Sequence, residues 1–69
     1  MAQNEYPKIT LEAARVNAHM NQNEACEALG ISKKTLQNYE QGKTMPKWDL
    51  VQRIEKVYKF PSGLISFGN

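Results

Sequence analysis

The sequence feature that most constrains the fold is a three-residue break between two segments of helical length. Gly30-Ile31-Ser32 separates residues 22–29 from residues 33–41. Glycine ends a helix because it adopts the left-handed conformation at little cost, and serine begins one because its hydroxyl caps free backbone amides. Two short helices joined by so short a turn cross at a steep angle, which is typical of a helix-turn-helix.

Capping residues predict where the two preceding helices begin. Thr10 is a candidate N-cap for a first helix over residues 11–19. Asn21 followed three residues later by Glu24 matches a capping box, in which each residue satisfies a backbone amide near the other. The second helix is therefore expected to start at Gln22.

Glycine and proline divide the second half of the chain. Gly42 is expected to end the third helix, and Pro46 to precede a fourth over residues 47–58. Pro61 stops that helix, and residues 62–65 predict one last turn. The side chains expected to pack inward from the fourth helix and the tail are apolar: Trp48, Val51, Ile54, Tyr58, Leu64, Ile65 and Phe67.

These segments predict an all-α fold, a compact bundle of four to five short helices that contains a helix-turn-helix. No segment alternates apolar and polar residues convincingly enough to predict a strand. At 69 residues the chain has room for one domain. Residues 1–9, interrupted by Pro7, are expected to form a flexible N-terminal arm, and residues 10–69 a single domain.

Positive charge is concentrated in one part of the sequence. The formal net charge is only +2, but the segment from Ser32 to Trp48 contains four lysines and one glutamate. Such a segment fits either a solvated lysine-rich surface or a surface that contacts nucleic acid.

The third helix separates its side chains by chemistry. At about 100° per residue, Thr35, Leu36 and Tyr39 fall on one side. The opposite side carries amides and lysines without a carboxylate: Lys33, Lys34, Gln37, Asn38 and Gln41. Amides can both donate to and accept from adenine, and lysine can donate to guanine or to phosphate. The alternative is an ordinary polar helix face.

The order and spacing of these residues resemble the phage repressor/Cro (Xre-like) helix-turn-helix family, whose fold is the lambda repressor-like DNA-binding domain. The resemblance covers about residues 10–67. The matching positions are Arg15, Met20-Asn21-Gln22-Asn23-Glu24-Ala25-Cys26, Leu29-Gly30-Ile31-Ser32, Thr35-Leu36, Tyr39-Glu40-Gln41-Gly42-Lys43 and Pro46.

The resemblance implies a role for each matching position. The residues implied in DNA base readout are on the third helix: Lys33, Lys34, Gln37 and Asn38. The residues implied in phosphate contacts flank them: Gln22, Gln41, Lys43, Thr44 and Lys47. Arg15 and Glu40 match an ion pair that ties the first helix to the third.

Other chemistry finds little support in the sequence. Cys26 stands where the family has a small alanine and is interpreted as a core residue, with a redox sensor as the alternative. One cysteine and one histidine, His19, provide no metal cluster of known spacing, and no catalytic triad or phosphate-binding loop is present. We therefore expect no enzyme activity, no cofactor, no small-molecule ligand, no membrane span and a cytoplasmic location.

The function expected is that of a sequence-specific regulator that binds double-stranded DNA, acting as a Cro-like repressor on a near-palindromic operator. We expect no separate dimerisation domain, so a homodimer, in solution or only on DNA, is expected to use the fourth helix and tail: Trp48, Leu64, Ile65 and Phe67. The alternatives are an antitoxin or host regulator of the same fold, and a protein-interaction module that has lost DNA binding.

Overall fold

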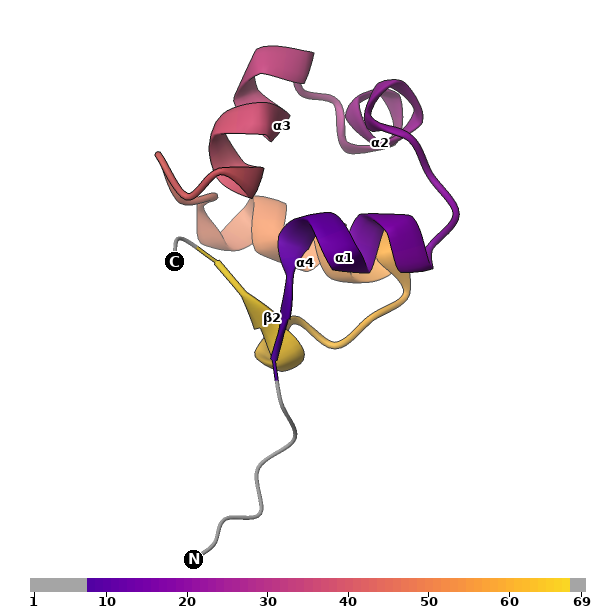
Figure 1. The fold of residues 1–69 in the computed structure, drawn as a ribbon, viewed down its shortest axis with the longest axis vertical. Coiled ribbons are helices and arrows are strands. Elements are labelled where there is room, and N and C mark those ends of the chain that lie inside the picture. The colour runs from indigo at the N-terminus through magenta and orange to yellow at the C-terminus, as the bar shows by residue number, and fades with distance from the viewer. Residues whose placement is uncertain (1–7, 68–69) are drawn as a thin grey trace, which may run out of the picture.

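The computed structural model describes residues 8–67, and its helices follow in the order that the sequence predicts. The elements are β1 (Ile9–Thr10), α1 (Leu11–Asn17), α2 (Gln22–Leu29), α3 (Lys33–Glu40), α4 (Trp48–Tyr58), the 3-10 helix η1 (Ser62–Leu64) and β2 (Ile65–Ser66). Figure 1 shows α2 and α3 at one end of the molecule and the strands at the other, with α1 and α4 between them. The mainly helical fold with its helix-turn-helix is confirmed.

Local capping interactions fix the helix-turn-helix. The side chain of Asn21 accepts from the Glu24 amide at 2.8 Å, and the Glu24 carboxylate accepts from the Asn21 amide at 2.9 Å. Gly30 has a φ of 74°, the left-handed conformation that ends α2, and Ser32 caps α3 by accepting from the Thr35 amide. These local interactions mark where α2 ends and where α3 begins.

The helix ends differ from the predicted ones by one or two residues. α1 ends at Asn17, two residues early, because His19 has a left-handed φ of 62°. α3 ends at Glu40, with Gln41 as its C-cap, and α4 begins at Trp48. α4 stops at Tyr58, where the sequence predicts, but through the left-handed Lys59 (φ 54°), two residues before Pro61.

The expectation that the chain has no strands is wrong. β1 pairs in parallel with β2, Ile9 opposite Ile65 and Thr10 opposite Ser66, so the two ends of the domain lie side by side. Strands of two residues are too short for alternation to reveal them, and their pairing depends on contacts between distant parts of the chain. The predicted arm falls largely on residues 1–7, which lie outside the described residues, whereas Ile9 belongs to β1.

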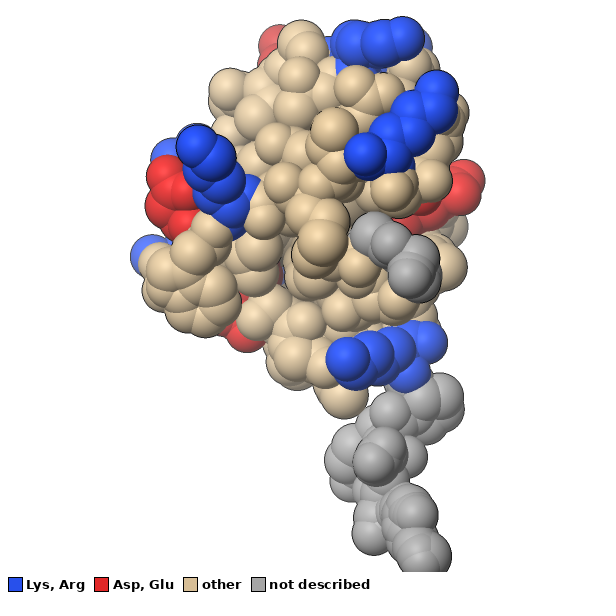
Figure 2. Space-filling view, turned by 90° about the vertical axis from the view of Figure 1, so that its left-hand side faces the viewer, with Lys and Arg blue, Asp and Glu red and all other residues tan. Residues whose placement is uncertain are grey.

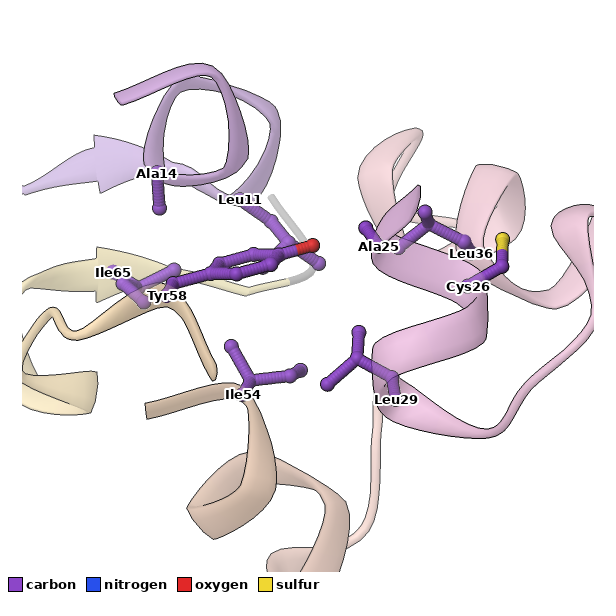
Figure 3. Close-up of a cluster of buried hydrophobic side chains, with 9 residues drawn as sticks. All are labelled: Leu11, Ala14, Ala25, Cys26, Leu29, Leu36, Ile54, Tyr58 and Ile65. Atoms are coloured by element: carbon purple, nitrogen blue, oxygen red, sulfur yellow. The ribbon is translucent and has the colours of Figure 1, made fainter. Parts of the chain in front are cut away.

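The core lies where α1, α2, α3, α4 and β2 meet. Figure 3 shows its nine buried side chains: Leu11, Ala14, Ala25, Cys26, Leu29, Leu36, Ile54, Tyr58 and Ile65. Cys26 is 8% exposed and takes the place of a small apolar residue within this cluster, as the sequence predicts.

Trp48 does not pack inward as expected, because its side chain is 70% exposed. The buried Ile54 lies six positions further along, which at about 100° per residue leaves the two side chains about 120° apart around α4. Val51 lies between them and is half-buried. In the tail, Ile65 is buried and Phe67 packs against the core, while Leu64 is half-buried.

Candidate nucleic-acid interface

α3 presents a polar outer surface while one leucine anchors it to the core. Leu36 is completely buried, and Tyr39 packs against the core from the same side. Lys33 and Lys34 are exposed in the first turn, and Gln37 and Asn38 are half-buried in the next. The four side chains predicted for base readout therefore remain at least partly accessible on one short helix.

The segment after α3 is fastened to the end of that helix. The Gly42 amide donates to the Tyr39 carbonyl at 3.2 Å, and the Lys43 amide donates to the Asn38 carbonyl at 2.9 Å. Gln41 and Lys43 are exposed beside α3 as a result. Thr44 and Lys47 are exposed further along this segment.

On the side of the molecule that carries residues 41–47, the charged side chains lie apart from one another. Figure 2 shows basic side chains around a mostly uncharged centre, with acidic side chains at the margins. The centre of this face therefore offers mainly uncharged groups, with basic side chains within reach around it.

Arg15 and Glu40 form a buried ion pair between α1 and α3. Arg15 Nε donates to Glu40 Oε2 at 2.7 Å, and the two side chains are 9% and 5% exposed. Arg15 Nη1 also donates to the Met20 carbonyl at 2.9 Å, at the entrance to α2. The hydrogen bond to Glu40 raises the pKa of the Arg15 guanidinium above its ordinary value. The pair therefore holds Glu40 away from the outer surface and fixes α3 relative to α1.

Gln22 joins this pair to the outer surface, a connection that the sequence analysis missed. Gln22 Nε2 donates to Glu40 Oε1 at 2.9 Å, and Gln37 Nε2 donates to Gln22 Oε1 at 3.5 Å. Gln22 is half-buried at the start of α2 and connects Glu40 with Gln37, which both lie on α3. Local sequence patterns give no signal for bonds between residues so far apart in the chain.

Arg53 is a second residue that the sequence analysis missed. From α4 its Nη1 donates to the carbonyl of Leu29 at 2.9 Å, the last residue of α2. A cation at a helix C-terminus satisfies a free carbonyl and interacts favourably with the helix dipole. This contact holds the helix-turn-helix against α4.

Tyr58 lies in the core near the ion pair. Burial raises the pKa of its phenol to about 12, the nearby Glu40 carboxylate acts in the same direction, and Arg15 opposes them. Among the described residues, its hydroxyl is the buried side-chain polar atom that lacks a hydrogen-bond partner. Tyr58 thus contributes packing at the cost of an unsatisfied hydroxyl.

The residues considered for metal or redox chemistry do not come together in the described part of the chain. No group of three or more His, Cys, Asp or Glu side chains in that range could hold a metal ion. His19 is exposed at the end of α1, and Cys26 is buried in the core. No helix of residues 8–67 is long and apolar enough to cross a membrane.

Comparison with known proteins identifies the family. A helix-turn-helix family matches residues 11–65, which contain all four α-helices. The chain is also 36% identical over 47 residues to the cryptic phage CTXphi transcriptional repressor RstR of Vibrio cholerae, a match that covers 68% of this chain and 42% of that repressor. No solved structure matches the chain.

The chain therefore belongs to the helix-turn-helix family, and within it to the phage repressor/Cro (Xre-like) type that its sequence resembles. This is a family of transcription regulators and not of enzymes. The chain spans less than half the length of the repressor that it matches.

Proposed function

We propose that the protein is a transcriptional repressor that binds a specific double-stranded DNA operator, with α3 in the major groove. The observation that carries this proposal is the outer surface of α3, where lysines and amides are accessible and the helix's one carboxylate, Glu40, is held in a buried ion pair. A carboxylate on that surface would repel the phosphates, whereas amides and lysines match base edges.

The proposed contacts are divided by chemistry. The proposed base contacts are Lys33, Lys34, Gln37 and Asn38. The proposed phosphate contacts are Gln22, Gln41, Lys43, Thr44 and Lys47. The backbone amides at the start of α2 add the partial positive charge of a helix N-terminus beside Gln22. No arginine lies on α3, so guanine recognition falls to Lys33 and Lys34.

Repression, rather than activation, is supported by the similarity to the phage repressor. A protein that covers a promoter blocks transcription without needing a second functional domain. A homodimer would place two copies of α3 about 34 Å apart on one side of the DNA and bind a near-palindrome. Such a regulator works in the cytoplasm, where a buried free cysteine such as Cys26 stays reduced.

The proposed dimer surface is an apolar area at the start of α4. Met45 and Trp48 are 63% and 70% exposed, and they line a shallow hollow of about 430 Å³ together with Val51 and Phe67. Ile65 is buried beneath it and contributes through the core. Exposed apolar side chains gathered in one place are typical of a surface that another molecule covers.

Substitutions on α3 test DNA binding. Operator sites are first selected from random DNA with the unchanged protein. Lys34→Ala and Asn38→Ala are then compared with Lys56→Ala, which removes an exposed lysine from α4. We expect each α3 variant to weaken operator binding by about tenfold, whereas Lys56→Ala has little effect.

Salt and a reporter gene separate the alternatives. Binding should weaken steeply with salt, and removing a phosphate-binding side chain such as Lys43 should reduce the slope of log K against log salt by about 1. Failure of the unchanged protein to select any site from random DNA would favour a protein-interaction module. Unchanged affinity in both α3 variants would place the DNA-binding surface elsewhere than on α3. A reporter placed behind the selected operator should be repressed, whereas activation would contradict the proposed mode of regulation.

A further inference from the structure

The hydrogen bonds that join Glu40 and Gln37 of α3 through Gln22 of α2 have a direction that one residue fixes. An ionised carboxylate accepts hydrogen bonds and cannot donate them. Glu40 Oε2 accepts from Arg15 Nε at 2.7 Å, and Glu40 Oε1 accepts from Gln22 Nε2 at 2.9 Å and from Arg15 Nη2 at 3.4 Å. Gln22 must therefore turn its amide nitrogen toward Glu40, which leaves its oxygen facing Gln37.

The direction continues from Gln22 to Gln37. The Gln22 oxygen can only accept, so the group that faces it from α3 must be the Gln37 nitrogen, 3.5 Å away. An isolated glutamine amide can turn over and exchange its donor and acceptor ends. Here the buried carboxylate at the far end of the chain of bonds selects one orientation.

This orientation decides which base Gln37 can match. One N–H of Gln37 is used by Gln22, and the second N–H and the oxygen remain for a ligand. In the major groove adenine offers an N6 amino donor beside an N7 acceptor, which suits an amide that presents its oxygen and one N–H together. Guanine offers two acceptors there and leaves the Gln37 oxygen unpaired.

We propose that Glu40 and Gln22 are positioning residues that make Gln37 specify adenine, an inference that rests on the DNA-binding function proposed above. The Glu40 side chain is only 5% exposed and never reaches the DNA. It acts through Gln22, which contributes to sequence preference in addition to any phosphate contact of its own.

Selection of bound sites from random DNA tests the proposal, because it measures the preference at each base pair separately. The variants are Gln37→Ala and Gln22→Ala, with Asn23→Ala as the control from the same turn of α2, exposed and outside the chain of bonds. In the unchanged protein we expect about a tenfold preference for adenine at one position. Gln37→Ala abolishes that preference, and Gln22→Ala reduces it severalfold at the same position only.

The results separate this role from a simple phosphate contact. If Gln22 only binds a phosphate, Gln22→Ala weakens binding to every sequence equally and leaves the base preferences unchanged. That outcome would overturn the positioning role while leaving the proposed function intact. If the unchanged protein shows no sequence preference at all, the proposed function fails and this inference fails with it.

A third variant tests the buried end of the chain of bonds. Glu40→Gln can still accept from Gln22 but can also donate, so the orientation of Gln22 is no longer fixed. We expect a severalfold loss of adenine preference at the Gln37 position, measured at a temperature where circular dichroism shows the variant folded. An undiminished preference in a folded Glu40→Gln variant contradicts the role of Glu40. If that variant does not fold, the base preferences of Gln22→Ala decide whether the chain of bonds positions Gln37.

Discussion

Two regions of this small protein reverse the usual distribution of side chains. Around α3, the charged pair Arg15 and Glu40 is buried, with side chains 9% and 5% exposed. At the start of α4, Trp48 is 70% exposed and Met45 63%. Charged side chains are seldom fully buried, and large apolar groups seldom gather at a surface, so neither arrangement follows from the need to form a core.

The difference between the two regions indicates different tasks. A buried ion pair contributes little net stability compared with apolar residues of the same size, but it holds its helices in one geometry through directional bonds. An exposed apolar area does not hold parts of the chain together. It contributes favourable free energy only when another molecule covers it and removes it from water. We therefore expect changes in the first region to affect folding and DNA contact together, and changes in the second to affect association alone.

The largest effect is expected from breaking the buried pair. Arg15→Ala leaves the Glu40 carboxylate buried without its cation and should lower the free energy of unfolding by about 3–5 kcal/mol. Unfolding in urea at neutral pH measures the loss, with Lys56→Ala as the exposed control. The double variant Arg15→Met with Glu40→Met should recover much of the stability. A loss below about 1 kcal/mol for Arg15→Ala would show that the pair does not hold the helices.

How far the sequence predicts the fold depends on the range of the interactions. The caps at Thr10, Asn21 and Ser32 and the left-handed Gly30 all act within three or four residues, and the structure contains each of them. The pairing of Ile9 with Ile65 joins opposite ends of the chain, so no local pattern announces it. Helical spacing wrongly predicts that Trp48 is buried. The spacing gives the direction of a side chain around α4, but it does not say how far around the helix the core reaches.

The candidate site shows the same limit. The polar outer surface of α3 follows from the helical period, and the pairing of Arg15 with Glu40 follows from family resemblance. The bonds of Gln22 to Glu40 and Gln37 span 18 and 15 residues and depend on how α2 and α3 cross. Arg53 at the end of α2 likewise depends on where α4 packs. Neither interaction can be found before the helices are placed.

An intermediate effect is expected at Tyr58, next to the buried pair. Its pKa is raised to about 12 in the folded protein from an ordinary value of about 10, so the folded state holds the phenol proton more tightly. The resulting stability is fully present below about pH 10 and is lost as the pH rises toward 12. The loss approaches about 3 kcal/mol once the pH passes 12, because the shift is about two pKa units and each unit corresponds to about 1.4 kcal/mol.

Tyr58→Phe isolates this contribution from other groups that titrate at high pH. The variant removes a buried hydroxyl that has no hydrogen-bond partner, so at pH 7 it should be as stable as the unchanged protein or about 1 kcal/mol more stable. Between pH 10 and 12 its stability should fall less steeply. Thermal unfolding at several pH values measures the stability of the two proteins. If it falls equally steeply with pH in both between pH 10 and 12, Tyr58 ionises as freely in the folded chain as in the unfolded one.

The smallest effect on folding is expected at Trp48. Because its side chain is 70% exposed, Trp48→Ala should change the free energy of unfolding by no more than about 0.5 kcal/mol. Its effect should appear in association instead: sedimentation on a palindromic operator should show two copies of the unchanged protein bound together and the variant bound one copy at a time. Val16→Ala is the matched control, since Val16 is 57% exposed on α1, outside the proposed dimer surface.

Paired binding that survives Trp48→Ala would place the dimer contact elsewhere, and a large loss of stability would mean that Trp48 supports the fold after all. Either result would remove the contrast between the two regions, because the exposed tryptophan would then have no task distinct from that of the buried pair.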